Sequence, residues 1–270
     1  NNTNFTLSIS NGPTTFTCAD VGQTFNVTLT AVDDYGNSNS CSSTITVAAE
    51  TTQFIGGDWN NGAPGPGSNA RISQNTNTSP TNAGSIESCV CEIDSGARLT
   101  ISSNEFIKIE RDITVNGTLR VQHRGSVLQT DSNAITNNAG TIEIETTSPN
   151  LDSKDFMILG SPMSGDIRTG VWNAVYLVLD HTTENFVPNA QVALLRPGAE
   201  NFADDNFDNW DAYIDGITPG EGYIVRPQSG NSQPGGIFNY TYTGGTLNNG
   251  LINFPIIYNT PGPLASDNRN

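Results

Sequence analysis

The sequence is poor in positive charge and has no long apolar segment. Only 11 Lys and Arg residues stand against 27 Asp and Glu residues, which gives a formal net charge of -16 over 270 residues. No cluster of basic residues could neutralise phosphates, so the sequence argues against binding to nucleic acid or to an anionic membrane. No run of about 20 apolar residues is present, which predicts the absence of a transmembrane segment. Calcium ions and neutral glycans are the more natural partners.

Helix-forming patterns are also scarce. Charged residues make up 14% of the chain, whereas Asn, Ser, Thr and Gly are abundant, and these residue types favour turns and exposed strands over helix interiors. The composition predicts an all-β protein of one large or several small domains. The N-terminal stretch lacks the charged and apolar regions of a signal peptide. We therefore expect a mature or excised piece of a longer protein.

Motifs for catalysis are missing as well. The two histidines, His123 and His181, leave little scope for a catalytic triad, and the GSP and RGS tripeptides are not followed by the helix of a nucleophile elbow. The glycines precede strands and not helix N-termini, so no phosphate-binding loop is predicted. The sequence predicts a protein that is not an enzyme.

The four cysteines are Cys18, Cys41, Cys89 and Cys91. Cys18 and Cys41 flank alternating strands, and a bridge between them would stabilise the fold by roughly 3 kcal/mol. Such a bridge indicates an oxidising, extracellular compartment. Cys89 and Cys91 would point to one face of a strand, where buried thiols or a strained local bridge are favoured over a zinc site because further ligands are few.

Residues 1–49 predict a β-hairpin of a sandwich. Phe25, Val27, Leu29 and Ala31 alternate with polar residues, and a turn at residues 33–37 leads into a second alternating strand. This stretch resembles the second half of a hyalin-repeat (HYR) module, an immunoglobulin-like domain, and Cys18 and Cys41 match its paired cysteines. The resemblance implies a partial immunoglobulin-like sandwich from a longer tandem array.

Residues 54–149 carry a weak internal repeat. GARLTI at 96–101, GTLRVQ at 117–122 and GTIEIE at 140–145 recur at similar spacings, and a glycine precedes each strand. This pattern predicts a short parallel β-helix, with an antiparallel meander as the alternative. Arg120 and Glu143 should then face solvent as an ion pair on neighbouring coils. The side chains expected inside are Leu99, Ile101, Ile107, Ile109, Leu119, Val121, Ile142 and Ile144.

Residues 150–270 predict a further β-sandwich-like domain, with strands in DFMILGSP, VYLVLDH, EGYIVRP and FNYTYTGG. WNNGAPGPGSNARI, DFMILGSPMSG, GAENFADDNFDNW, PGEGYIVRP and GTLNNGLINFPIIYNTPGP resemble the region before the C-terminal sorting domain of large surface proteins in gliding Bacteroidota. The resemblance implies a cell-surface adhesin that is exported by type IX secretion and supports adhesion or gliding. Its implied partners are the secretion and anchoring machinery and extracellular surfaces or polysaccharides.

The acidic stretch DDNFDNWDAYID raises the question of calcium. Side-chain oxygens at alternate positions are typical of a calcium loop, whereas Asn209 stands where such a loop needs glycine. A hydrated polar turn without metal is slightly favoured, and both interpretations stay open. The candidate ligands are Asp204, Asn206, Asp208, Trp210 and Asp215.

Two alternative functions remain. Trp210 is a candidate for stacking on a sugar ring, and Trp59 is expected to cover the open end of the β-helix. A polysaccharide-cleaving β-helix would instead use charged residues on one exposed sheet, and the candidates are Glu110, Asp112, Arg120, Arg124 and Glu143. We expect a non-enzymatic extracellular adhesin segment, with carbohydrate binding or cleavage as the alternative.

Overall fold

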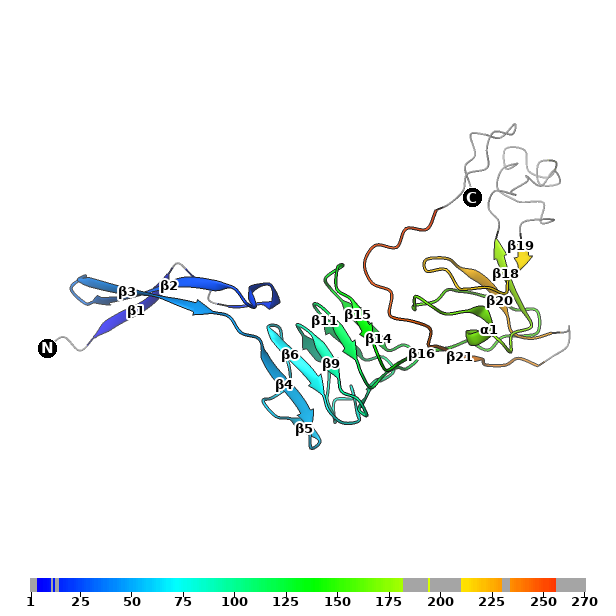
Figure 1. The fold of residues 1–270 in the computed structure, drawn as a ribbon, viewed down its shortest axis with the longest axis horizontal. Coiled ribbons are helices and arrows are strands. Elements are labelled where there is room, and N and C mark those ends of the chain that lie inside the picture. Colours follow the sequence, from blue (N-terminus) through cyan, green and yellow to red (C-terminus); the bar gives the residue numbers. More distant parts are fainter. Residues whose placement is uncertain are drawn as a thin grey trace. The chain divides into compact units, whose positions relative to one another are not determined.

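The protein is nearly all β. The computed structural model describes residues 4–10, 12, 15–181, 194, 210–229 and 234–255. The chain divides into two compact units, one of residues 1–119 and 125–140 and one of residues 120–124 and 141–270. Strands provide almost all of the regular structure (Figure 1), as the scarcity of helix formers predicts.

The first sheet is antiparallel and has three strands, β1 (Phe5–Ser10), β2 (Thr24–Asp33) and β3 (Ser38–Thr46), in that order. A 3-10 turn, η1 (Cys18–Asp20), precedes β2. In the β2–β3 turn, the Asp33 carboxylate accepts hydrogen bonds from the backbone N–H groups of Tyr35 and Asn37, at 2.9 and 2.8 Å. The local side-chain bonds that Asp makes in turns explain this geometry, and the predicted hairpin is confirmed.

A β-solenoid of about five turns follows. Its strands recur in three sheets, and parallel pairs run through them, including β4 with β6, β6 with β9 and β8 with β11. In Figure 1, β6 and β9 are neighbours in one sheet and β11 and β14 are neighbours in another, each pair from successive coils. The predicted parallel β-helix is therefore confirmed and the antiparallel meander was wrong.

The first solenoid sheet has the order β21-β16-β13-β10-β7, the second β14-β11-β8, and the third β15-β12-β9-β6-β4-β5. The bounds of the strands are β4 (Glu50–Ile55), β5 (Asp58–Trp59), β6 (Ser68–Ile72), β7 (Thr76–Asn77), β8 (Ile86–Ser88), β9 (Cys91–Ile93), β10 (Arg98–Ile101), β11 (Phe106–Ile109), β12 (Ile113–Val115), β13 (Thr118–Val121), β14 (Ser126–Gln129), β15 (Thr136–Asn138), β16 (Thr141–Thr147) and β21 (Asn239–Tyr242).

The solenoid core consists of branched aliphatic side chains at alternate strand positions. Seven of the eight predicted inward residues are buried, and the eighth, Ile144, is half-buried. This alternation follows from the two-residue period of a strand, which sends every second side chain inward. The buried seven are Leu99, Ile101, Ile107, Ile109, Leu119, Val121 and Ile142.

Two of the repeat glycines are required by the close approach of neighbouring coils. A Cβ atom at Gly117 would lie 2.2 Å from the carbonyl oxygen of Ala97 and 2.3 Å from that of Asp94. A Cβ atom at Gly140 would lie 2.1 Å from the carbonyl oxygen of Gly117. Each glycine therefore sits against the backbone of the preceding coil, where no side chain has room.

Different side chains close the two ends of the solenoid. Trp59 on β5 is buried, packs edge-on against Phe54 with ring centroids 5.3 Å apart, and donates its indole N–H to the carbonyl of Ala83. Its predicted role as an end cap is confirmed, since β5 is the last strand of its sheet. In the last coil, Thr136 stands in register with Ile113, and its hydroxyl donates to Gln129. Polar side chains thus replace aliphatic ones where stacking ends.

The second unit contains an antiparallel sheet with the order β17-β20-β18-β19. The predicted strands in this region are confirmed, and one helical turn was not expected. The largest buried side chains of the second unit are Trp172, Tyr223 and Tyr242. The bounds are β17 (Met157–Leu159), α1 (Arg168–Val171), β18 (Leu177–His181), β19 (Trp210–Ala212) and β20 (Tyr223–Arg226).

The predicted ion pair between Arg120 and Glu143 was wrong, because Arg120 has a different partner. The Arg120 guanidinium lies 2.7 Å from Glu145, two residues beyond Glu143 on the same strand. Residues two apart point to the same face of a strand, and the long Arg side chain can reach along it. Arg120 therefore contacts the next carboxylate on that face.

Candidate functional site

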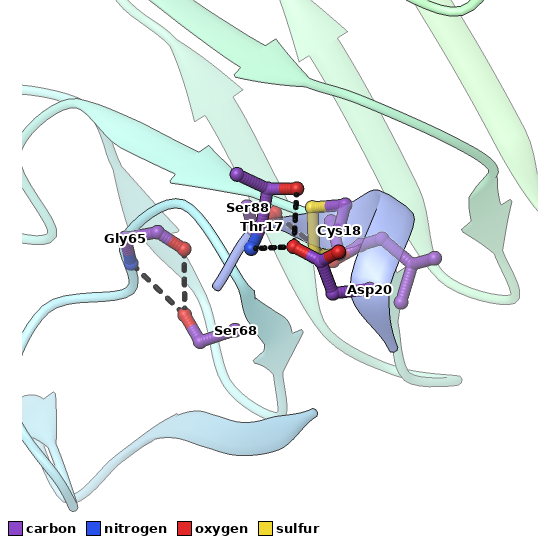
Figure 2. Close-up of a disulfide and its surroundings, with 8 residues drawn as sticks. Thr17, Cys18, Asp20, Gly65, Ser68 and Ser88 are labelled. Atoms are coloured by element: carbon purple, nitrogen blue, oxygen red, sulfur yellow. Dashed lines mark hydrogen bonds between the residues drawn. A yellow bond between two sulfur atoms is a disulfide. The ribbon is translucent and has the colours of Figure 1, made fainter. Parts of the chain in front are cut away.

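A disulfide joins the region before the first hairpin to the solenoid. Cys18 in η1 and Cys89 just before β9 form the bond, with Cα atoms 5.3 Å apart, and both residues are buried (Figure 2). On the Cys18 side, Asp20 accepts hydrogen bonds from the N–H and hydroxyl of Thr17, at 2.8 and 3.0 Å. On the solenoid side, the N–H of Cys89 donates to the carbonyl of Ser68 at 2.7 Å. We call this bond the staple.

The predicted pairing of Cys18 with Cys41 was therefore wrong. Cys41 lies opposite Leu29, five residues from the start of β2 at Thr24. At about 3.3 Å per residue, this places it roughly 17 Å along the hairpin from the end that follows η1. A disulfide requires Cα atoms within about 7 Å, so Cys41 is out of reach of Cys18.

Two cysteines remain as thiols. Cys41 is exposed on β3, and Cys91 is buried in the solenoid. Burial, together with the charge of Glu92, raises the pKa of Cys91 to about 12. Cys91 is thus the buried thiol that the sequence favoured over a zinc ligand, and it is unreactive because the thiolate is the nucleophilic form.

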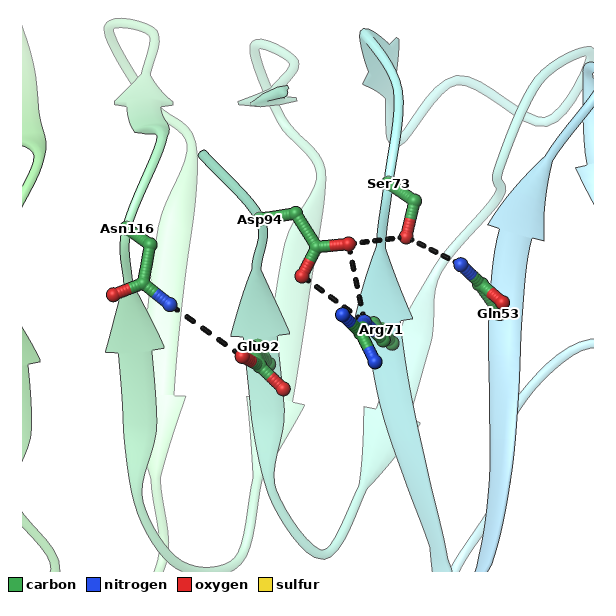
Figure 3. A network of polar contacts seen from close by, with 6 residues as sticks. All are labelled: Gln53, Arg71, Ser73, Glu92, Asp94 and Asn116. Carbon is green, nitrogen blue, oxygen red and sulfur yellow. Dashed lines mark hydrogen bonds and ion pairs between the residues drawn. The ribbon is translucent and has the colours of Figure 1, made fainter. Parts of the chain in front are cut away.

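A row of polar side chains crosses the outer face of the third solenoid sheet. We call these six residues the polar ladder, and Figure 3 shows how they lie. Register places Gln53 beside Arg71 and Arg71 beside Glu92 on successive strands. The members of the polar ladder are Gln53, Arg71, Ser73, Glu92, Asp94 and Asn116.

Side chains of the polar ladder form hydrogen bonds with one another between neighbouring coils. The amide of Gln53 donates to the Ser73 hydroxyl at 2.6 Å, and this hydroxyl donates to Asp94 at 2.5 Å. The Arg71 Nε lies 3.0 and 3.1 Å from the two Asp94 oxygens. Each bond ties one coil to the next, so the polar ladder reinforces the stacking of the solenoid.

These contacts keep Asp94 ionised. Partial burial acts to raise the pKa of Asp94, but hydrogen bonds from Ser73 and Arg71 and the charge of Arg71 outweigh burial and hold the pKa below its usual value. A carboxylate with a lowered pKa is poorly suited to general acid catalysis at neutral pH. The arrangement is that of a structural ion pair.

The period of the sequence repeat is itself a signal for these pairs. Arg71 and Asp94 are separated by 23 residues, Glu92 and Asn116 by 24, and Arg120 and Glu145 by 25. These separations are close to one coil of the solenoid, so residues one repeat apart become neighbours. The repeat therefore could have identified Arg71 and Asp94 as partners.

The charged residues proposed for polysaccharide cleavage are divided among different elements. Arg120 and Glu143 lie on β13 and β16, and Arg124 lies in the turn before β14 with a φ of 68°. Glu110 and Asp112 lie between β11 and β12, where the Asp112 carboxylate accepts the N–H of Ile135 at 2.9 Å. The five residues therefore do not share one sheet face, which the cleavage hypothesis requires.

An aromatic and acidic cluster lies at the β18–β19 edge. The exposed Trp210 packs on His181 across the strand pair, with ring centroids 4.5 Å apart. Asp180 stands opposite Asp211 in the same pair. Burial, the charge of Glu221 and a hydrogen bond to Glu221 raise the pKa of Asp180, although the N–H of His181 acts in the opposite direction. Like charges across a strand pair destabilise the sheet.

The Asp180→Asn variant is expected to be more stable than the parent protein at pH 7. Because the folded-state pKa of Asp180 lies above its unfolded value, the parent protein loses stability as pH rises from the unfolded pKa through the folded pKa. The gain should therefore vanish at about pH 3, where the aspartate is largely protonated in both states. Thermal melts from pH 3 to pH 8 would measure it, with the exposed turn residue Asp34→Asn as control. An equal gain at pH 3 and pH 7 would contradict this reason.

The calcium prediction remains a prediction. Asp204, Asn206 and Asp208 lie outside the described residues. Trp210 is the first residue of β19, and the backbone carbonyl of Asp215 accepts the N–H of Arg168. In the described part of the chain, no group of three or more His, Cys, Asp or Glu residues could hold a metal ion. Within the same residues, no helix is long and apolar enough to cross a membrane.

Comparison with known proteins identified one family. The family described as a domain of unknown function (DUF8693) matches residues 49–269, which is more than half of the chain. The match includes the solenoid and extends through the second unit. No curated protein and no solved structure matches the chain.

Proposed function

We propose that the chain, which belongs to the DUF8693 family, is a non-enzymatic segment of an extracellular adhesin. Its role is that of a spacer that resists tension while the protein contacts a surface. The resemblance to surface proteins of gliding Bacteroidota supports export by type IX secretion, a place at the cell surface and a role in adhesion or gliding. The alternating strands of residues 1–49 resemble part of a hyalin-repeat module, although Cys18 and Cys41 do not pair as in that module, and this resemblance supports a position next to further modules.

The staple is the observation that carries this proposal. It joins residues that are 71 positions apart in the sequence, and strands β2 to β8 all lie inside the loop that it closes. Tension that enters at the N-terminus passes from Cys18 to Cys89 through the covalent bond and bypasses those strands. Disulfides persist in oxidising compartments, which supports an extracellular location.

The solenoid supports the same role. Its coils are joined by parallel strand pairs and by the polar ladder, in which the side chains of Gln53, Ser73, Arg71 and Asp94 are satisfied by one another. A network of polar side chains whose hydrogen bonds are made within the network is rigid. These contacts favour a rigid spacer.

Retention of the chain on a surface, measured together with cleavage of that surface, tests this function. Beads that carry the chain should be retained under flow on films of algal or plant polysaccharides, and no oligosaccharide should appear in the eluate. Beads coated with an unrelated acidic protein of equal size are the control. Release of soluble sugar fragments by the chain would contradict the non-enzymatic proposal.

Carbohydrate binding is the second candidate, and the exposed Trp210–His181 pair favours it. An exposed indole braced by a second ring offers a flat surface for a sugar ring. If this pair binds glycans, Trp210→Ala should weaken binding on a glycan array about tenfold, which corresponds to roughly 1.4 kcal/mol of aromatic contact. Tyr35→Ala, which removes another exposed aromatic residue, should leave binding unchanged. Equal loss in both variants would contradict a specific site.

A further inference from the structure

The dipeptide Asn-Gly occurs at two places in the solenoid with opposite surroundings. Asn61 and Gly62 lie in the turn after β5, beside the end cap that Trp59 forms, and Asn116 and Gly117 lie at the corner between β12 and β13. In such a dipeptide the glycine nitrogen can attack the side-chain amide of the asparagine with little hindrance, because glycine has no Cβ atom beside that nitrogen. The two sites therefore place the same chemistry in two structural settings.

The site at Asn61 is open. Asn61 and Gly62 are both exposed, and a Cβ atom at Gly62 would meet no atom within 4 Å. In the described part of the chain, neither the Asn61 side chain nor the N–H of Gly62 has a hydrogen-bond partner. Water can therefore reach the Gly62 nitrogen and remove its proton, and the amide of Asn61 can rotate into line for the attack.

The site at Asn116 is closed by the neighbouring coil. The N–H groups of Asn116 and Gly117 both donate to the carbonyl of Ile93, at 2.9 and 3.1 Å. The side-chain amide of Asn116 lies 3.4 Å from the Glu92 carboxylate in the polar ladder (Figure 3). The Gly117 nitrogen cannot attack while its N–H is bound, so this site has to open locally before it can react.

We propose that Asn61 is a site of spontaneous deamidation. The Gly62 nitrogen gives its proton to water and bonds to the Cγ atom of Asn61. The bond between this Cγ atom and the amide nitrogen breaks, and the nitrogen takes a proton from water and leaves as ammonia. Water then opens the resulting cyclic imide at either carbonyl carbon, which gives an aspartate or an isoaspartate. Water is the only co-reactant.

The isoaspartate product would weaken the end cap of the solenoid. Its main chain runs through the former side chain, which lengthens the backbone between Asn61 and Gly62 by one methylene group. The carbonyl of Gly62 accepts a hydrogen bond of 2.8 Å from the hydroxyl of Thr52, which is buried on β4. A displaced carbonyl leaves this hydroxyl unpaired in the interior, and an unpaired buried polar group lowers stability.

Mass spectrometry of peptides from the full chain, incubated in mildly alkaline buffer, tests the proposal. Each rate of conversion is divided by the rate at the same site in the urea-unfolded chain, which removes the effect of flanking residues. The ratio should be at least about tenfold higher at Asn61 than at Asn116, because the Gly117 N–H must first lose its hydrogen bond. Equal ratios, or an Asn61 that converts in the unfolded chain alone, would overturn the proposal.

A matched pair of variants tests the effect on the end cap. The melting temperature of the parent chain should fall by roughly 2–6 °C as Asn61 converts. Glutamine carries the same amide but needs a larger ring, which closes more slowly, so Asn61→Gln should keep its melting temperature throughout the incubation. Asn116→Gln makes the same change at the closed site and should follow the parent chain. A parent chain that keeps its melting temperature after Asn61 has converted would contradict the weakening of the end cap.

Discussion

Removal of the staple is expected to lower the free energy of unfolding of the first unit by about 4 kcal/mol. The staple closes a loop of 71 residues, and the chain-entropy relation gives this value for a loop of that length. The variant is Cys18→Ala/Cys89→Ala, which removes both partners and leaves no free thiol at the site. Both positions are buried, and alanine leaves no polar group there without a partner.

Urea denaturation of the oxidised protein and the double variant would measure this difference. Cys41→Ala, at an exposed thiol, is the control and should change the free energy by less than about 0.5 kcal/mol. Mass spectrometry of the unreduced parent protein should also recover the Cys18 and Cys89 peptides as one linked species. A double variant as stable as its parent would show that the staple does not hold the unit together.

Gly117→Ala is expected to destabilise the solenoid by about 3 kcal/mol, at the upper end of the usual cost of overpacking. The new methyl group would lie 2.2 Å from one backbone oxygen and 2.3 Å from another. Both atoms belong to the preceding coil, whose strands are fixed by hydrogen bonds, so they cannot move aside as a flexible side chain would. The coils would have to separate at this corner.

Gly65→Ala is the matched control for this prediction. A Cβ atom at Gly65 meets no atom within 4 Å, and its backbone does not require a positive φ. This substitution should change the free energy of unfolding by less than about 0.5 kcal/mol. Thermal or urea unfolding of the two variants side by side measures the difference. Equal stability of Gly117→Ala and Gly65→Ala would contradict the close stacking of the coils.

The periodic parts of the fold could be predicted from the sequence. Alternating residues such as Leu99 and Ile101 must face one side of a strand, and the repeat of that pattern after each glycine favoured stacked coils over an antiparallel meander. The β2–β3 hairpin followed from its alternation and its Asp-containing turn. In each case the information lies within a few neighbouring residues or within one repeat.

The disulfide pairing could not be predicted in the same way. It depends on how η1 meets the solenoid, and no local pattern between residues 18 and 89 encodes that contact. The alternating strands that Cys18 and Cys41 flank, and the resemblance to a hyalin-repeat module, favoured Cys41, but the length of the hairpin carries Cys41 away from η1. The predicted ion pair of Arg120 with Glu143 was wrong because the long Arg side chain can reach either of two carboxylates on one strand face, and it contacts Glu145.

The most direct test of the spacer role is extension of the single molecule under force. The oxidised chain, held at its two ends, is predicted to unfold without extending residues 19–88, because the staple encloses them. Reduction should release the 71-residue loop and add about 250 Å of contour length, at roughly 3.5 Å per residue. The Cys18→Ala/Cys89→Ala variant should show the longer extension without reductant. An oxidised chain that extends as far as the reduced one would contradict the account.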